Sequence, residues 1–206
     1  MRPAKNETEA AILEAAHTVF VRKGTSGANL KDIAQEADVN QALLHYYFRD
    51  KQTLADTVFQ QVASEFIPRI QETFTAEQPV EDKVETIVER YFELLRDKPY
   101  LPVYIVGELN QNPEEMKERI RSMGLAPFEN LDRLDEQLRE KSEAGEFRPI
   151  SSEEFIVNLL SLCIFPFIGR PLIEAMFDMD EEAFDRFVEE RKKTLPSLFL
   201  NSLRPS

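Results

Sequence analysis

The residue types that most often carry catalysis are scarce in this chain of 206 residues. Its two histidines are His17 and His45, and Cys163 is its single cysteine. The sequence has no HExxH motif, no glycine-rich phosphate loop and no histidine close to the cysteine. These are the usual signatures of zinc hydrolysis, phosphate binding and cysteine nucleophiles. The sequence therefore predicts that the protein is not an enzyme and uses no metal and no cofactor.

Cys163 lies in an apolar run at residues 158–169 that also contains Pro166. A single cysteine excludes an internal disulfide, and an apolar setting favours a buried structural thiol. The run is much shorter than the roughly 20 residues needed to cross a bilayer. Polar residues follow Arg2 and Lys5 where a secretory signal would have an apolar segment. We expect a cytoplasmic protein.

Composition and charge indicate the fold class and a division into domains. Few glycines, little Thr/Val alternation and many Leu, Ala, Glu and Arg residues predict an all-α protein of about nine helices. Residues 1–51 hold seven basic and seven acidic residues, whereas residues 52–206 hold 18 and 31 and carry the whole net charge of -13. Because an acidic body would repel phosphates, the neutral N-terminal part is the better candidate for nucleic acid. We predict one domain at 1–51 and another at 52–206.

The N-terminal part has the spacing of three helices. Apolar residues recur at helical intervals from Ile12 to Phe20, and Gly24 can provide a left-handed cap after Lys23. Asn29 can cap a second, short helix, and a third can follow a tight turn. Two short helices joined by a turn and braced by a longer one form a helix-turn-helix, whose second short helix fits the roughly 12 Å major groove of DNA.

Asn40 is placed to cap the third helix, which we expect from Gln41 to about Phe48. At 100° per residue, Leu44 and Phe48 face the core together with Val39. The outward face is small and polar in its first turn and aromatic farther along. Its residues are Gln41, Ala42, Leu43 and Tyr46, with His45 and Tyr47 at the edges.

The run NLKDIAQEADVNQALLHYYFRDKQTL resembles the helix-turn-helix signature of the tetracycline-repressor (TetR) family of bacterial transcription regulators. The resemblance covers about residues 8–60 and implies a DNA-binding regulator whose helical body binds ligand and forms a dimer. The matching positions are Ile33, Ala34, Val39, Leu44, Tyr47, Phe48 and Lys51.

The resemblance also implies which residues contact DNA. Asp38 stands where the family usually has glycine, so the turn must accept a left-handed aspartate. Leu43 and His45 also depart from the commonest residues, threonine and tyrosine. The implied contacts are Asn29 and Lys31 with a phosphate; Gln41, Ala42 and Leu43 with base edges; and His45, Tyr46, Tyr47 and Lys51 with the DNA backbone.

In this family the last two long helices pair with their copies in a second subunit, and here they are expected at 152–165 and 181–202. A homodimer also suits a palindromic operator, which two recognition helices meet in successive major grooves. The candidate dimer contacts are Phe155, Leu159, Phe184, Phe187, Val188 and Leu195. The candidate ligand-pocket residues are Phe66, Tyr91, Tyr104, Phe128 and Phe165.

The functional prediction is a repressor that a small apolar or amphipathic ligand releases from a palindromic operator. Pro68 lies inside the predicted helix that joins the two domains, so a bend there could relay the signal. Two alternatives stay open. One is a DNA-bound regulator controlled by a protein partner, with no small-molecule pocket; the other is a helical interaction protein.

Overall fold

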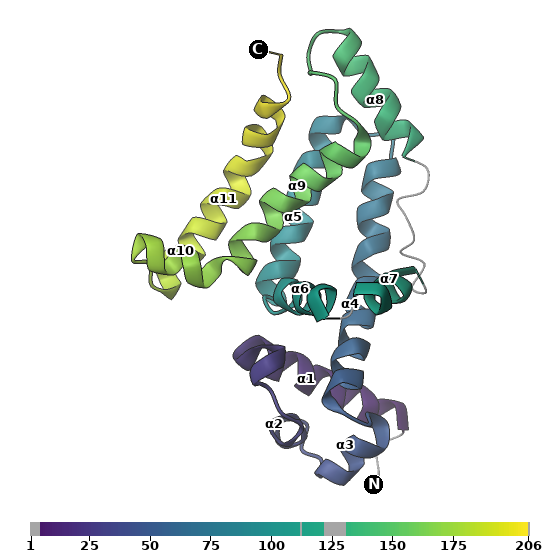
Figure 1. The fold of residues 1–206 in the computed structure, drawn as a ribbon, viewed down its shortest axis with the longest axis vertical. Helices are drawn as coiled ribbons and strands as arrows, with labels where there is room; N and C mark the ends of the chain where they lie inside the picture. The colour runs from purple at the N-terminus through teal and green to yellow at the C-terminus, as the bar shows by residue number, and fades with distance from the viewer. Residues whose placement is uncertain (1–4, 112, 122–130, 206) are drawn as a thin grey trace. The chain divides into compact units, whose positions relative to one another are not determined.

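The computed structural model describes residues 5–111, 113–121 and 131–205, and every regular element in these ranges is helical (Figure 1). The all-α prediction is confirmed. The helices are α1 (Lys5–Gly27), α2 (Leu30–Glu36), α3 (Gln41–Tyr47), α4 (Lys51–Thr75), α5 (Val80–Asp97), α6 (Leu101–Gln111), α7 (Pro113–Ile120), α8 (Asp132–Glu143), α9 (Ser152–Ile168), α10 (Arg170–Phe177) and α11 (Glu181–Ser202). The sequence did not predict α10, which begins after Gly169 and has Pro171 in its first turn.

Side-chain caps begin four of these helices, among them the two that the sequence predicts at Asn29 and Asn40. In each case a side-chain oxygen accepts a hydrogen bond from the backbone amide three residues later, which satisfies one of the free donors of the first turn. The pairs are Asn29 with Asp32 (2.9 Å), Asn40 with Leu43 (2.7 Å), Ser151 with Glu154 (3.3 Å) and Asp180 with Ala183 (2.8 Å).

The chain forms two compact units. The first comprises residues 1–66 and 97–123, and the second comprises residues 67–96 and 124–206. The first turns of α4 pack within the first unit, and the domain boundary expected after residue 51 stays a prediction. Lys51 contacts backbone carbonyls at the end of α1 and just after it, and Val58 is buried beside that helix.

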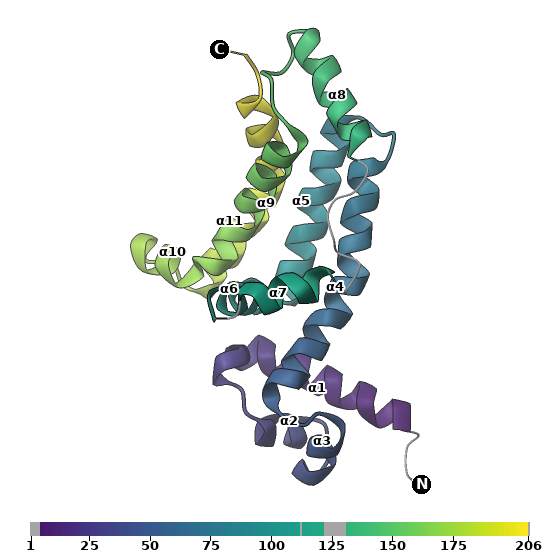
Figure 2. The ribbon, with the colours of Figure 1, turned by 45° about the vertical axis from the view of Figure 1, so that its right-hand side comes forward.

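In the second unit, α9 and α11 lie side by side and antiparallel (Figure 1), and the end of α4 runs antiparallel to α5 (Figure 2). The rings of Phe155 and Phe199 join α9 to α11 with centroids 5.0 Å apart. Arg191 donates to the Leu162 carbonyl oxygen at 3.0 Å. These contacts make the facing sides of α9 and α11 part of the core of a single chain.

Most of the predicted dimer contacts belong to that core of a single chain, which argues against a direct role in a dimer. A side chain that is already buried within one chain has no surface to offer a partner. The sequence identified the apolar stripe of each helix correctly, but this stripe packs inside the protomer. The buried residues are Phe155, Leu159, Phe184, Val188 and Leu195, while Phe187 is partly exposed.

Other large apolar side chains of α9 and α11, and several of α10 between them, are exposed. Each is more than half exposed, whereas such residues are usually scattered singly on a monomer surface. They are Val157 and Phe165 on α9, Leu172, Met176 and Phe177 on α10, and Leu198 on α11.

Lys83 is fully buried in the second unit, and its Nζ donates to the Phe74 carbonyl oxygen at 2.6 Å. The ammonium therefore lies at the C-terminal end of α4, where free carbonyls and the helix dipole favour a cation. Burial, together with the nearby charge of Arg133, lowers the pKa of Lys83 from 10.5 to about 8.

Pro68 lies within α4, which continues as one helix from Lys51 to Thr75. The role of Pro68 as a hinge stays a prediction. Among the described residues, no single helix is both long and apolar enough to cross a membrane; α9 and α10 meet the criteria only as a pair bent by 67°.

Candidate nucleic-acid interface

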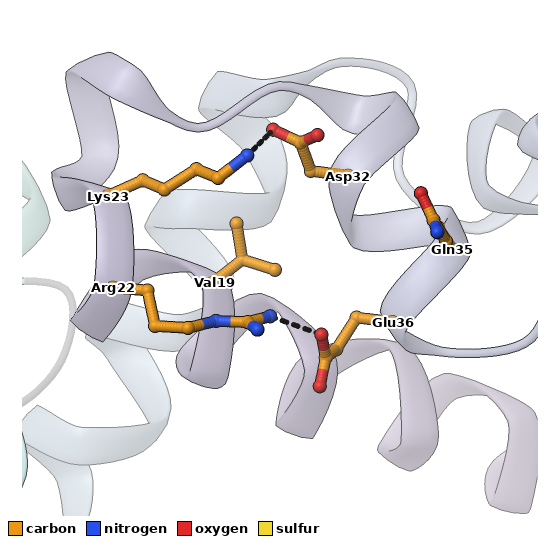
Figure 3. A pocket seen from close by; sticks show the side chains of 6 residues that line it. All are labelled: Val19, Arg22, Lys23, Asp32, Gln35 and Glu36. Carbon is orange, nitrogen blue, oxygen red and sulfur yellow. Dashed lines mark hydrogen bonds and ion pairs between the residues drawn. The ribbon is translucent and has the colours of Figure 1, made fainter.

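Two ion pairs join α1 to α2, the first helix of the helix-turn-helix. Arg22 pairs with Glu36, and Lys23 Nζ lies 2.8 Å from Asp32 Oδ2 (Figure 3). Figure 3 shows both pairs and Val19, and these five residues line one pocket. Each exposed pair contributes little stability alone, but both cations are already neutralised by carboxylates. Arg22 and Lys23 are thus braces between helices.

The turn after α2 depends on Asp38, whose φ of 51° lies in the left-handed region. This confirms the conformation expected for an aspartate at a position where the family usually has glycine. The amide of Val39 donates to the Ala34 carbonyl oxygen at 3.0 Å, so the chain reverses directly over the end of α2. The left-handed residue allows this reversal because it redirects the backbone within one residue.

The structure divides α3 into an inner and an outer face. Leu44 is 0% exposed and Phe48, its C-cap, is 3% exposed, so both hold α3 to its module as predicted. Tyr46 is 73% exposed, and its ring meets that of Tyr47 edge-on with centroids 5.4 Å apart. Gln41, Ala42 and His45 are exposed, whereas Leu43 and Tyr47 are partly buried.

The outer face offers different chemistry along its length. Gln41 has an amide that can both donate to and accept from a base edge, and Ala42 is small enough to permit close approach. His45 Nδ1 lies 3.0 Å from the Arg49 carbonyl oxygen, which can only accept, so Nδ1 carries the proton. Nε2 is therefore the ring nitrogen left for a partner. The hydroxyl of Tyr46 lies farther along the same exposed surface, at a position suited to a phosphate.

Lys51 has a role that the sequence did not predict. Its Nζ donates to the Ser26 and Ala28 carbonyl oxygens at 3.3 and 3.1 Å. The ammonium thus ties the start of α4 to the end of α1 and the residue that follows it. One of its three N–H groups is left over, so the predicted phosphate contact stays a prediction.

Lys31 and Arg49 are two further exposed basic side chains of the N-terminal module. Lys31 lies in the first turn of α2, next to Asn29, whose own side-chain oxygen caps that helix. Arg49 follows the C-terminus of α3 and was not identified from the sequence, although its charge next to the aromatic run was a visible signal. Both can approach a phosphate.

The predicted ligand-pocket residues lie in different environments. Tyr104 is buried, and its hydroxyl donates to Asp56 on α4. Phe66 and Tyr91 are partly buried, Phe165 is 57% exposed, and Phe128 lies outside the described residues. The exposure of Phe165 argues against its lining an enclosed pocket in a single chain. The pocket itself stays a prediction.

Comparisons with known proteins cover nearly the whole chain. The family "Bacterial regulatory proteins, tetR family" matches residues 12–58, and "YsiA-like protein, C-terminal region" matches residues 59–188. The Fatty acid metabolism regulator protein of Bacillus subtilis (strain 168) is 26% identical over 174 residues, 84% of this chain and 85% of that protein. The Probable HTH-type transcriptional regulator YttP of the same strain is 26% identical over 201 residues, 95% of each chain.

A solved structure has the same fold. The transcriptional regulator FadR from Bacillus subtilis, in complex with stearoyl-CoA, matches with a TM-score of 0.62 and 19% identity, covering 95% of this chain and 99% of that one. The capped and outward-facing α3 and the family match over both parts of the chain lead to one conclusion: this protein belongs to the TetR family of DNA-binding transcription regulators.

Proposed function

We propose that this regulator is a homodimeric repressor that binds a palindromic operator through α3 and is released by an amphipathic effector with a long acyl chain. The observation that carries the DNA-binding part is the outer face of α3. Gln41, Ala42 and His45 are exposed, while Leu44 and Phe48 are buried. The buried face therefore fixes α3 to its module, and the exposed first turn is free to enter a major groove.

The proposed division of contacts follows from exposure. Gln41, Ala42 and Leu43 face base edges, and His45, Tyr46 and Tyr47 face the backbone. Asn29, Lys31 and Lys51 complete the phosphate contacts implied by the family, and we add Arg49 because it is exposed.

The effector class is supported by the relatives. One is named for fatty acid metabolism, and the FadR structure holds stearoyl-CoA. The C-terminal family match covers residues 59–188, which include most of the helical body. A long acyl chain agrees with the small apolar or amphipathic ligand expected from the sequence.

The homodimer is supported by the exposed apolar side chains of α9, α10 and α11. Val157, Phe165 and Leu198 replace the buried residues first predicted as dimer contacts. Covering such side chains removes apolar area from water, at roughly 25 cal/mol for each Å². The two copies would then carry their recognition helices to grooves about 34 Å apart.

The test begins with selection of genomic fragments by the purified protein. Binding to the selected fragment is then measured by fluorescence anisotropy, alone and with stearoyl-CoA, coenzyme A or a short-chain acyl-CoA. We expect stearoyl-CoA to weaken operator binding about 5- to 150-fold and coenzyme A to have no effect. Absence of any preferred sequence would refute the DNA-binding part. Operator binding that no acyl-CoA changes would refute the effector class alone.

A further inference from the structure

A polar contact within the first unit joins α1 to the residues that follow α5. Lys98 Nζ lies 3.1 Å from His17 Nε2 and 2.7 Å from Asp97 Oδ2, and that Asp97 oxygen is 3.8 Å from His17 Nε2. An ammonium can only donate hydrogen bonds, so His17 Nε2 must accept this one with its lone pair. The contact therefore exists only while His17 is neutral.

Solvent can reach this contact. His17 and Lys98 line a groove of about 300 Å³ together with Leu13 of α1 and Val58 and Val62 of α4. The side chains of His17 and Lys98 are 18% and 21% exposed. Protons can consequently exchange with His17 without unfolding of α1.

The charges around His17 act in both directions. Burial is the main cause that lowers the pKa of His17, and the Lys98 ammonium lowers it further. Asp97 and Glu14 raise it, but by less in sum. Gln61 of α4 also lines the groove and is neutral. The ring of Tyr100 packs against the imidazole of His17, with ring centroids 5.8 Å apart. The neutral form is therefore favoured in the folded protein.

We propose that His17, Lys98 and Asp97 form a proton-sensitive contact between the first helix of the DNA-binding module and residues 97–111. Protonation of Nε2 removes the acceptor and places two cations 3.1 Å apart. Asp97 can then pair with either cation but cannot restore the hydrogen bond between them. Acidification thus loosens α1 from residues 97–111.

This contact has a consequence for DNA that rests on the proposed operator binding. A loosened α1 braces α2 and α3 less firmly, so part of the binding free energy is spent on ordering the module. Operator affinity should therefore fall as His17 becomes protonated. His45 on α3 is the other histidine of the chain, so the experiments that follow are made in a His45→Gln background.

The first experiment follows the histidine ring signals by NMR as pH is lowered, without DNA. The chain has two histidines, so His45→Gln leaves the signal of His17 alone. We expect the midpoint of His17 to lie below its ordinary value of 6.5 and to rise in the Lys98→Met variant. An unchanged midpoint in Lys98→Met would overturn the proposal, because the Lys98 ammonium would then have no effect on the protonation of His17.

The second experiment compares operator affinity at pH 7.5 and pH 5.5, about one unit on either side of the ordinary histidine pKa. His45→Gln is compared with the double variant His17→Gln/His45→Gln, in which glutamine can still accept from Lys98 but cannot titrate. We expect acidification to reduce the operator affinity of the single variant at least about fivefold more than that of the double variant. Equal losses would overturn the regulatory part. If the wild-type protein prefers no sequence at pH 7.5, the proposed function fails, while the NMR titration still decides the contact.

Discussion

Gln41 is the side chain of α3 best suited to read a base, because it is exposed in the first turn and its amide can pair with an adenine edge. Gln41→Ala should weaken binding to the selected operator by about 1 to 3 kcal/mol and leave binding to random DNA unchanged. Fluorescence anisotropy on both DNAs checks this. Lys31→Ala is the matched control, since loss of a phosphate contact should weaken both DNAs alike and flatten the salt dependence. Similar losses on the two DNAs for Gln41→Ala would contradict the division of contacts.

Lys51 combines a structural role with its predicted DNA contact. Lys51→Met keeps most of the side-chain stem but removes the ammonium from the Ser26 and Ala28 carbonyl oxygens. We expect the free energy of unfolding to fall by about 1 to 2 kcal/mol, because hydrogen bonds from a charged donor are lost. Urea unfolding without DNA measures this, with Lys31→Met as the control. Equal stability of the two variants would mean that the carbonyl contacts contribute nothing.

Lys83 should make stability depend on alkaline pH. Its pKa is lowered to about 8 in the folded chain, so between that value and 10.5 the unfolded chain binds more protons than the folded one. The free energy of unfolding should therefore rise as pH increases from about 8 toward 10. Urea unfolding of the wild type and Lys83→Met at several pH values tests this. Parallel pH profiles for the two proteins would show that Lys83 is not the cause.

At the scale of the element, the turn between α2 and α3 decides where the recognition helix points. Asp38 holds a left-handed conformation that costs an ordinary residue about 1 kcal/mol, and glycine adopts it freely. Asp38→Gly should stabilise the protein by roughly 0.5 kcal/mol, because the greater entropy of glycine in the unfolded chain offsets part of the relieved strain. Asp38→Ala should destabilise the protein by about 1 kcal/mol. Thermal and urea unfolding give the order. An alanine variant as stable as the wild type would contradict the strain.

The same elements show how far local rules extend. Asn29 and Asn40 begin their helices as expected because a cap needs only a side-chain acceptor and an amide three residues later. In contrast, α10 was missed because its eight residues follow Gly169 directly, and an apolar run gives no period to separate two helices.

At the scale of the whole molecule, the exposed apolar residues of α9, α10 and α11 should hold the dimer together. Phe165→Glu should shift the protein to monomers at micromolar concentration, as measured by analytical ultracentrifugation, because it places a charge in the proposed interface. Val103→Glu on α6 is the control, since Val103 is similarly exposed but lies in the first unit. A Phe165→Glu protein that stays dimeric would place the interface elsewhere.

Phe155→Ala distinguishes the core from the interface. Phe155 is fully buried against Phe199, so its truncation should cost about 3 to 5 kcal/mol of unfolding free energy. Urea unfolding should show this loss. The difference in unfolding free energy between Phe155→Ala and the wild type should be the same at every protein concentration. A loss confined to dimerisation would restore the first prediction for this residue.

The fold class, the starts of α2 and α3 and the two faces of α3 follow from the sequence, because caps and helical periodicity act over a few neighbouring residues. The sequence could not show that Lys51 binds carbonyls near the end of α1, that Lys83 caps α4, or that Lys98 meets His17 from 81 residues away. Nor could it tell which apolar stripe of α9 and α11 packs inside the chain. Periodicity reveals that a face is apolar, but only the tertiary structure decides what covers it.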